Sequence, residues 1–320
     1  MLNLNKKYII TSGNAYVDID ALACCLAYKN LLKMIGFSAH VLLTGPLNET
    51  ISKTIMSWNL PISKNIPNNI DDYYFILLDI SDLKYVEPFV IEDNVVKVFD
   101  HHHGFEKYWI NKIGHENCHI EKIGACATLI WEQYKKFNQE KNISAISANL
   151  LFTSIISNTL DLKAYITTDR DIQSLHELRK YITLPKNWKE HYYSEIENKI
   201  LTNIQTAIMK DKKILKIKNR NYIIGQIELW NAKKVINKKN IIETVMKGLD
   251  VKTNKDKRWL MNIPSISQGF NYIIVRDQEL KSRFKNLLNI SFIDEDIGKT
   301  SRLWLRKEII QELSYYNKKN

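Results

Sequence analysis

Along the first half of the chain, short apolar runs alternate with stretches whose apolar residues recur at helical spacing. The short runs predict strands at Tyr8–Thr11, Ala39–Leu43, Tyr74–Leu78 and Val95–Phe99. The helical spacing predicts helices at Ala21–Ile35, Thr50–Trp58, Ala125–Phe137 and Ile143–Leu160. Thr168, with Asp171 three residues later, predicts a capping box that opens a further helix. This alternation is typical of a parallel sheet covered by helices.

The second half repeats an alternation of strands and helices after a break in the pattern. Strands are predicted at Ile214–Lys218, Tyr222–Glu228 and Tyr272–Val275, and helices at Ile241–Leu249 and Arg306–Tyr315. The turn-prone residues 219–221, Asn-Arg-Asn, separate the first two strands. The charged and aromatic stretch Leu184–Asn198 is the predicted linker. We therefore predict an α/β protein with two domains, residues 1–190 and 191–320.

Composition supports a folded protein and argues against a membrane protein. The chain has 320 residues, of which 45% are hydrophobic, enough to bury two cores. The polar start of the chain lacks the pattern of a signal peptide, and the longest apolar stretch, Ile143–Leu160, is interrupted by serine, threonine and asparagine. The four cysteines give neither a zinc pair nor a disulfide framework. We expect no membrane association and a reducing, cytoplasmic compartment.

The net charge is consistent with an anionic ligand but does not identify it. The formal charge is +11, but the lysines are spread along the whole chain rather than clustered. A surplus of this kind fits any anionic ligand, including phosphate. The charge therefore does not choose among anions.

Acidic and imidazole residues follow three of the predicted strands. Asp18 and Asp20 come after the first, Asp79 after the third, and Asp100 opens the run Asp-His-His-His after the fourth. The carboxyl ends of neighbouring parallel strands meet in one crevice, so these side chains are expected to converge. Each aspartate alone is more often a helix cap or a loop residue, and Asp20 in particular fits the N-cap of the helix that follows. Together, clustered oxygen and imidazole ligands predict a site for Mn²⁺, Mg²⁺ or Co²⁺.

These residues resemble the DHH phosphoesterases, in the branch whose second domain is of the DHHA2 type. Residues 13–21 read GNAYVDIDA, which is similar to the GNxxxDxD form found in yeast-type exopolyphosphatases and prune-type proteins; family II inorganic pyrophosphatases have HxxxDxD instead. Asp79 ends its strand as the second family motif does, and residues 100–102 read DHH. Residues 124–128, GACAT, are similar to the segment before the third helix of the family. The resemblance implies a parallel-sheet DHH domain followed by a smaller α/β DHHA2 domain, with the active site in the cleft between them.

The resemblance also implies a site for two divalent ions, for which we favour Mn²⁺. Asn14, Asp18 and Asp79 would hold one ion, and Asp20, Asp79 and His101 the other, so that Asp79 bridges them. A hydroxide held between two such ions attacks phosphorus in line without a covalent enzyme intermediate.

Two neighbouring residues are expected to assist. Asp100 would fix the His101 ring from behind, and His102 would bind phosphate or assist proton transfer.

The chain departs from the pyrophosphatase pattern at two ligand positions. Asn14 stands where pyrophosphatases have histidine, and Asn158 stands where the family has its last aspartate ligand. An amide oxygen is an uncharged and weaker ligand. Asp161, three residues after Asn158, would lie on nearly the same helical face and replace the missing charge.

In the second domain the resemblance points to basic residues that bind substrate. Arg306 and Lys307 resemble the basic pair of the SRK motif, although Leu305 stands where serine is expected, and Lys213 matches the other substrate lysine. Arg302 is a spare candidate. Arginine offers a planar fork and lysine a point charge to phosphate oxygens.

The sequence thus predicts a manganese-dependent hydrolase of pyrophosphate or short-chain polyphosphate. The alternatives are a DHH nuclease or nucleotide phosphodiesterase, and a phosphate-binding regulatory protein with weakened catalysis. No Gly-rich phosphate loop is present, and the glycine-rich, histidine-containing motif of the nuclease branch is not visible. We expect a small phosphorylated substrate, no nucleic acid, and a monomer or homodimer.

Overall fold

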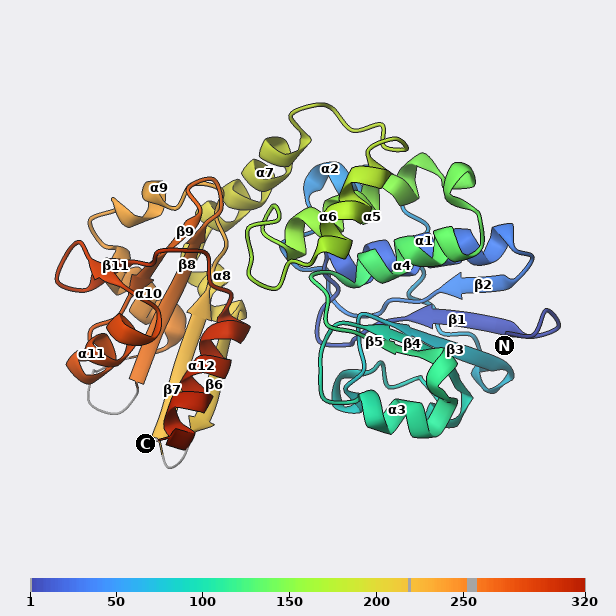
Figure 1. The fold of residues 1–320 in the computed structure, drawn as a ribbon, viewed down its shortest axis with the longest axis horizontal. Coiled ribbons are helices and arrows are strands. Elements are labelled where there is room, and N and C mark those ends of the chain that lie inside the picture. Colours follow the sequence, from blue (N-terminus) through green and yellow to red (C-terminus); the bar gives the residue numbers. More distant parts are fainter. Residues whose placement is uncertain (1, 218–219, 252–257, 320) are drawn as a thin grey trace. The chain divides into compact units, whose positions relative to one another are not determined.

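The computed structural model describes residues 2–217, 220–251 and 258–319. The chain divides into two compact units (Figure 1). The first unit comprises residues 1–162 and 166–189, and the second comprises residues 163–165 and 190–320. The short segment Lys163–Tyr165 therefore leaves the first unit and belongs to the second.

A five-stranded parallel sheet forms the centre of the first unit. The strands run in the order β2-β1-β3-β4-β5. Their bounds are β1 (Lys7–Thr11), β2 (Ser38–Val41), β3 (Tyr73–Leu78), β4 (Val95–Asp100) and β5 (Cys118–Ile120). β1 and β3 are buried along most of their length, as expected for strands covered on both faces. The four predicted strands of this half are confirmed, and β5 was not predicted.

Helices cover both faces of this sheet. In Figure 1, α3 lies on one face, while α1, α4 and α5 lie on the other. The bounds are α1 (Ile19–Met34), α2 (Lys53–Met56), α3 (Glu106–Ile113), α4 (Cys126–Lys136), α5 (Ala145–Asn158) and α6 (Asp169–Leu178). α7 (Trp188–Thr202) begins at the last residues of the first unit and belongs mostly to the second. Short 3₁₀ helices are η1 (Ile70–Asp72), η2 (Leu83–Tyr85), η3 (Glu92–Asn94), η4 (His115–Asn117) and η5 (Glu140–Asn142). α1 is apolar on nearly all sides because it packs against α4, α5 and the sheet.

Helix ends in the first unit differ from the sequence prediction at three places. The N-cap of α1 is Asp18, whose carboxylate accepts from the backbone N–H groups of Asp20 and Ala21, so the prediction of Asp20 as the cap was wrong. The predicted helix Thr50–Trp58 is only one turn long because Ser52 caps it late. α5 ends at Asn158 instead of continuing to position 160. The capping box of Thr168 and Asp171 is confirmed.

The second unit contains a mixed sheet in the order β10-β11-β9-β8-β7-β6. β7 and β8 are parallel, and the other neighbours are antiparallel. The bounds are β6 (Lys212–Ile217), β7 (Arg220–Gln226), β8 (Arg258–Ser265), β9 (Phe270–Ile274), β10 (Ser291–Phe292) and β11 (Ile297–Lys299). The predicted strands correspond to β6, β7 and β9. The predicted turn falls partly at position 219, which, like position 218, lies outside the described residues.

Helices of the second unit pack on this sheet around an apolar core. They are α8 (Ile204–Lys210), α9 (Lys233–Ile236), α10 (Ile241–Leu249), α11 (Gln278–Leu287) and α12 (Arg306–Lys319). Ile309 and Leu313 of α12 are buried against Tyr222, Leu260 and Phe284. The predicted linker is largely helical, because α7 occupies much of it. α12 begins at Arg306, as predicted.

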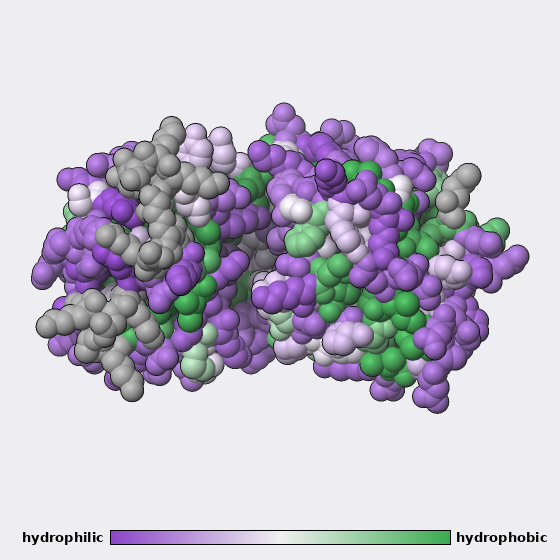
Figure 2. All heavy atoms as spheres, turned by 90° about the horizontal axis from the view of Figure 1, so that it is seen from below, coloured by the Kyte–Doolittle hydropathy of each residue, from purple (hydrophilic) through white to green (hydrophobic). Residues whose placement is uncertain are grey.

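The surface carries mostly polar residues. On the face drawn in Figure 2, hydrophilic residues predominate and apolar residues occupy smaller patches between them. Within the described residues, no helix is both long enough and apolar enough to cross a membrane.

Candidate metal centre

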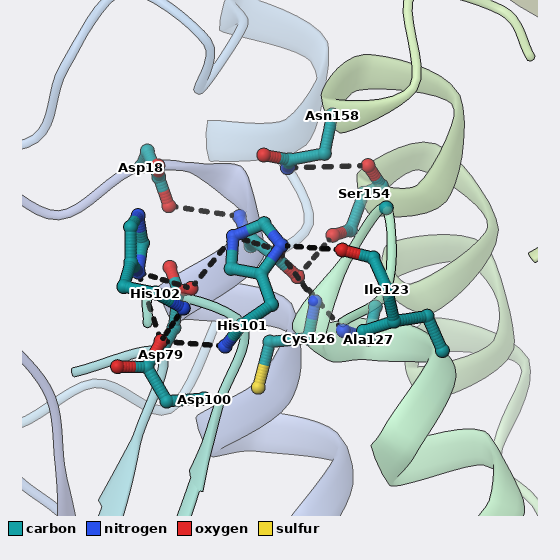
Figure 3. Close-up of polar contacts among 12 residues, drawn as sticks. Asp18, Asp79, Asp100, His101, His102, Ile123, Cys126, Ala127, Ser154 and Asn158 are labelled. Carbon is teal, nitrogen blue, oxygen red and sulfur yellow. Dashed lines mark hydrogen bonds and ion pairs between the residues drawn. The ribbon is translucent and has the colours of Figure 1, made fainter. Parts of the chain in front are cut away.

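The candidate metal centre lies where three neighbouring strands of the parallel sheet end. β1, β3 and β4 are adjacent, and their carboxyl ends lead to the loop with Asp18, to Asp79, and to the run that begins with Asp100. Asp79 has a left-handed backbone with a φ of 58°, and its N–H donates to the carbonyl of Phe99 at 2.8 Å. A non-glycine residue in this conformation is uncommon and occurs preferentially at functional sites. The parallel sheet thus gathers residues that are far apart in sequence (Figure 3).

His101 faces two carboxylates through one ring nitrogen. Its Nε2 atom lies 3.5 Å from Oδ1 of Asp79 and 3.9 Å from Oδ2 of Asp20. Its other ring nitrogen, Nδ1, lies 3.2 Å from the carbonyl oxygen of Ile123. A carbonyl only accepts, so Nδ1 carries the proton in the neutral ring and Nε2 presents a lone pair. His101 is thereby held in the tautomer that binds metal.

The carboxylates of the cluster are electrostatically unfavourable without a cation. Burial raises the pKa of Asp79 well above its usual range, and the neighbouring Asp20 and Asp18 raise it further. Burial also raises the pKa of Asp20 to about 6, with Asp18 adding to the effect. Oδ1 of Asp79 is buried and has no hydrogen-bond partner among the described residues. Lone pairs of Asp79, Asp20 and His101 therefore point at one another, an arrangement that fits a divalent ion.

Asp79, His101 and His102 form a group whose ligand atoms lie within 4.8 Å of one another. Asp20 also approaches His101, as given above. The structure therefore brings together the residues that the sequence analysis assigned to the second ion.

Asp20 is anchored by donors that sequence reasoning missed. Its carboxylate accepts from the backbone N–H groups of Cys126 and Ala127, both at 2.9 Å, and from the hydroxyl of Ser154 at 2.6 Å. The two amides belong to the first turn of α4, which has no side-chain cap of its own. Asp20 therefore completes the start of a helix distant in sequence. The GACAT segment was the available signal, but nothing in it indicated that Asp20 was the partner.

Asn14 is oriented by the chain that follows β3. Its Nδ2 donates to the carbonyl of Val86 at 3.0 Å, and its backbone N–H donates to the carbonyl of Tyr85 at 2.8 Å. Because the Val86 carbonyl accepts only from the amide nitrogen, the Nδ2 contact defines which way the side-chain amide points. The amide oxygen of Asn14 is then the atom available as a ligand.

Asp100 holds the ring of His102, whereas we expected it to hold the ring of His101. Oδ1 of Asp100 lies 2.8 Å from Nδ1 of His102 and accepts from the backbone N–H groups of His101 and His102. Burial raises the pKa of Asp100, but the hydrogen bond and charge of His102 outweigh it and leave that pKa below its usual value. The expectation for the His101 ring was wrong, because the carbonyl of Ile123 occupies that position. His102 is 59% exposed.

Asn158 and Asp161 do not share a helical face. α5 ends at Asn158, and the next residues, Leu160, Asp161 and Leu162, all have left-handed backbone conformations with φ of 50°, 58° and 63°. Asp161 forms an ion pair with Lys189. The helical argument for replacing the missing ligand charge was therefore wrong. Asn158 itself extends from the end of α5 toward the cluster (Figure 3), and its Nδ2 lies 3.4 Å from the carbonyl of Ser154.

The basic residues predicted to bind substrate lie in the second unit. The guanidinium of Arg306 is 2.7 Å from Oδ1 of Asp211, at the start of α12. Lys307 follows it and is exposed, and Lys213 is exposed on β6, two residues after Asp211. Arg302, the spare candidate, is paired with Glu308 at 2.9 Å and lies over the ring of Trp304. The guanidinium of Arg302 is therefore already engaged by Glu308 and Trp304.

Comparison with known proteins gives similarity over almost the entire chain. A manganese-dependent inorganic pyrophosphatase from Methanothrix thermoacetophila is 23% identical over 325 residues, covering 97% of this chain and 99% of that protein. A probable manganese-dependent inorganic pyrophosphatase from Lactobacillus delbrueckii subsp. bulgaricus is also 23% identical, over 314 residues, with 94% and 96% covered. No family model matches the chain.

A solved structure gives the same picture for the fold. The crystal structure of a Methanococcus jannaschii protein assigned to family II of the inorganic pyrophosphatases aligns with a TM-score of 0.62 at 19% identity. The alignment covers 97% of this chain and 99% of that protein. The sequence and fold similarities thus both include the two units.

Proposed function

We propose that this chain, related over nearly its whole length to the manganese-dependent inorganic pyrophosphatases, is a metal-dependent hydrolase of inorganic pyrophosphate. The observation that carries the proposal is the meeting of the Nε2 lone pair of His101 with buried carboxylate oxygens of Asp79 and Asp20. Carboxylates and an imidazole at the carboxyl edge of a parallel sheet can bind the divalent ions that phosphoryl-transfer enzymes use.

The residues present fit two divalent ions, and we favour Mn²⁺. Asp20, Asp79 and His101 would hold one ion, and Asn14, Asp18 and Asp79 the other. Divalent ions bound there polarise phosphoryl oxygens and lower the pKa of water. The chain contributes by orienting the ligands, and the Ile123 carbonyl holds His101 in the tautomer whose Nε2 carries no proton.

His102 and Asp100 supply a side chain that can exchange a proton with substrate. The Asp100 carboxylate accepts from Nδ1 of His102, so Nε2 is the ring nitrogen assigned to the contact with substrate. The ring is mostly exposed, so a phosphate oxygen can reach it. We assign His102 to phosphate binding or proton transfer and Asp100 to holding its ring.

We assign Arg306, Lys307 and Lys213 of the second unit to binding of the phosphate groups. Cations that contact phosphate oxygens form charge-assisted hydrogen bonds, and arginine binds in a two-pronged geometry. A domain boundary at residues 190 and 191, and an active site between the domains, stay predictions of the sequence analysis. The chemical class of substrate is a small phosphoanhydride, and the expected compartment remains the reducing cytoplasm, consistent with four unpaired cysteines.

One experiment separates this proposal from its alternatives. Phosphate release is measured from pyrophosphate, tripolyphosphate, long-chain polyphosphate and a short oligonucleotide, each with Mn²⁺ and with Mg²⁺. We expect metal-dependent turnover of pyrophosphate, with slower release from longer polyphosphate. Preferred cleavage of the oligonucleotide would instead support a nuclease. Metal-dependent binding of pyrophosphate without turnover would support the regulatory alternative.

A further inference from the structure

Three buried amide side chains cross the sheet of the second unit. Gln226 lies at the end of β7, Asn262 in β8 and Asn271 in β9. Asn262 and Asn271 are completely buried, and Gln226 is 6% exposed. Burying an amide is costly unless each polar atom finds a partner, and an apolar side chain would fill such a position at lower cost. Three of them in one row therefore require an explanation.

The three amides are joined to one another by hydrogen bonds. Nδ2 of Asn271 donates to Oδ1 of Asn262 at 2.5 Å, and Nδ2 of Asn262 donates to Oε1 of Gln226 at 2.7 Å. Nε2 of Gln226 then donates to Oε1 of Glu228 at 2.8 Å. Because each link joins a donor to an acceptor, the orientation of all three amides is set.

Among the described residues, the other side-chain hydrogen bonds of these three amides go to one backbone segment, Trp304 to Arg306. The N–H of Trp304 donates to Asn271 at 3.0 Å, and its carbonyl accepts from Asn271 at 2.6 Å and from Asn262 at 2.9 Å. The N–H of Arg306 donates to Oε1 of Gln226 at 2.6 Å. The row is thus built around the chain that enters α12.

A fourth side chain completes the restraint of this segment. The N–H of Leu305 donates to Oε2 of Glu308 at 2.8 Å, and Glu308 is itself paired with Arg302 at 2.9 Å. Every backbone N–H from Trp304 to Arg306 therefore has a side-chain partner. The path of the backbone into the first turn of α12 is fixed, and with it the point from which Arg306 and Lys307 extend.

We infer that Gln226, Asn262 and Asn271 are positioning residues for phosphate binding by Arg306 and Lys307. The inference rests on the proposed function, because it takes these two cations as the substrate-binding pair. A two-pronged contact between arginine and phosphate loses strength when the guanidinium is displaced by a fraction of an ångström. Burying the three amides costs desolvation free energy. Their hydrogen bonds hold the backbone of Arg306 in place, and this keeps its guanidinium in the position that the phosphate contact requires.

Gln226→Met tests the inference, with Gln268→Met as the matched control. Methionine is close to glutamine in shape but removes the acceptor for the Arg306 N–H. Gln268 lies in the same unit, and its amide contacts Ser265 rather than the Trp304–Arg306 segment. Steady-state hydrolysis of pyrophosphate and calorimetric binding of imidodiphosphate are measured on the full chain with Mn²⁺, together with Mn²⁺ affinity and thermal stability.

We expect Gln226→Met to raise KM and the dissociation constant of imidodiphosphate about tenfold, equivalent to about 1.4 kcal/mol. Mn²⁺ affinity should stay unchanged and kcat should fall much less than KM rises. In an Arg306→Ala background the same substitution should raise KM by a smaller factor, because only Lys307 of the two positioned cations remains. Asn271→Leu, which removes the acceptor for the Trp304 N–H, replaces Gln226→Met if that variant does not fold.

The failure of the inference and the failure of the proposed function give different results. Unchanged KM and imidodiphosphate affinity in Gln226→Met, or equal effects with and without Arg306, would overturn the positioning role while leaving the hydrolase intact. A wild-type chain that binds imidodiphosphate but does not hydrolyse pyrophosphate would overturn the function alone, and the binding comparison would still test the three amides.

Discussion

The hydroxyl of Ser154 lies 2.6 Å from the carboxylate of Asp20, although 134 residues separate them. This hydrogen bond helps to aim a carboxylate that we assign to a metal ligand. Removing a group that orients a ligand typically lowers metal affinity 10–100-fold. We therefore expect Ser154→Ala to weaken Mn²⁺ binding by about tenfold, measured by calorimetry, because two backbone donors to Asp20 remain.

Ser174→Ala is the matched control for that prediction. Ser174 is equally buried, on α6, and its hydroxyl has no hydrogen-bond partner among the described residues. Its replacement should leave Mn²⁺ affinity unchanged. Equal Mn²⁺ affinities for wild type and Ser154→Ala would mean that Asp20 does not depend on this contact or does not bind metal.

Asn158 provides a test by gain of affinity. An aspartate at this position would restore the carboxylate expected from the family resemblance, and a charged oxygen binds a divalent ion more strongly than an amide oxygen does. Asn158→Asp should therefore raise Mn²⁺ affinity by about tenfold. Asp161→Asn should change it less than about twofold, since Lys189 already pairs with that carboxylate. A larger change in Mn²⁺ affinity for Asp161→Asn than for Asn158→Asp would indicate that Asp161 is the ligand.

Arg306 is predicted to act on substrate and not on metal. Loss of one charge-assisted contact to phosphate costs about 1.5–3 kcal/mol, which corresponds to roughly ten- to more than a hundredfold. Arg306→Ala should reduce kcat/KM for pyrophosphate by tens of fold without altering Mn²⁺ affinity. Arg276→Ala, which removes an arginine paired with Asp296 in the same unit, should retain near-normal turnover. A change in metal binding alone would refute the assignment.

Glu228 gives the stability of the protein a pH dependence. Burial raises its pKa to about 7, with Asp211 adding to the effect, whereas the unfolded chain has a pKa near 4.5. The folded state therefore holds the proton more tightly, and stability falls as pH rises from about 4.5 to about 7. Glu228→Gln should raise the free energy of unfolding at pH 8 by about 1–2 kcal/mol and change it little at pH 4.5, measured by urea denaturation. A gain that is equal at both pH values would contradict the pKa assignment.

Periodicity was sufficient to predict the parallel sheet of the first unit. β1 and β3 are mostly apolar, and β4 is apolar except at Lys97 and Asp100, a pattern typical of strands buried on both faces. Periodicity did not predict the elements whose apolar residues are interrupted by polar or charged ones. β8 contains arginine, asparagine and proline among its apolar residues and was not predicted, and α7 was taken for a linker because its charges and aromatics obscure the helical spacing.

The site was predictable in its ligand types and not in the contacts that orient them. The GNxxxDxD and DHH motifs identified the family resemblance, which similarity over 94–97% of the chain to manganese-dependent inorganic pyrophosphatases confirms. The partners of Asp20 and of His101 come from the start of α4 and from the carbonyl of Ile123. A backbone group has no sequence signature, so only tertiary structure reveals which donors and acceptors it meets.

The shared carboxylate of Asp79 tests the central claim most directly. Pyrophosphate hydrolysis and bound Mn²⁺ are measured for wild type, Asp79→Asn and the control Asp93→Asn, which alters an exposed aspartate paired with Lys112. Asparagine keeps the shape of the side chain but removes the charge that balances the ions. We predict metal-dependent turnover by wild type and Asp93→Asn, and loss of turnover with weakened Mn²⁺ binding in a folded Asp79→Asn. Near-normal hydrolysis by Asp79→Asn at saturating Mn²⁺ would contradict the two-metal account.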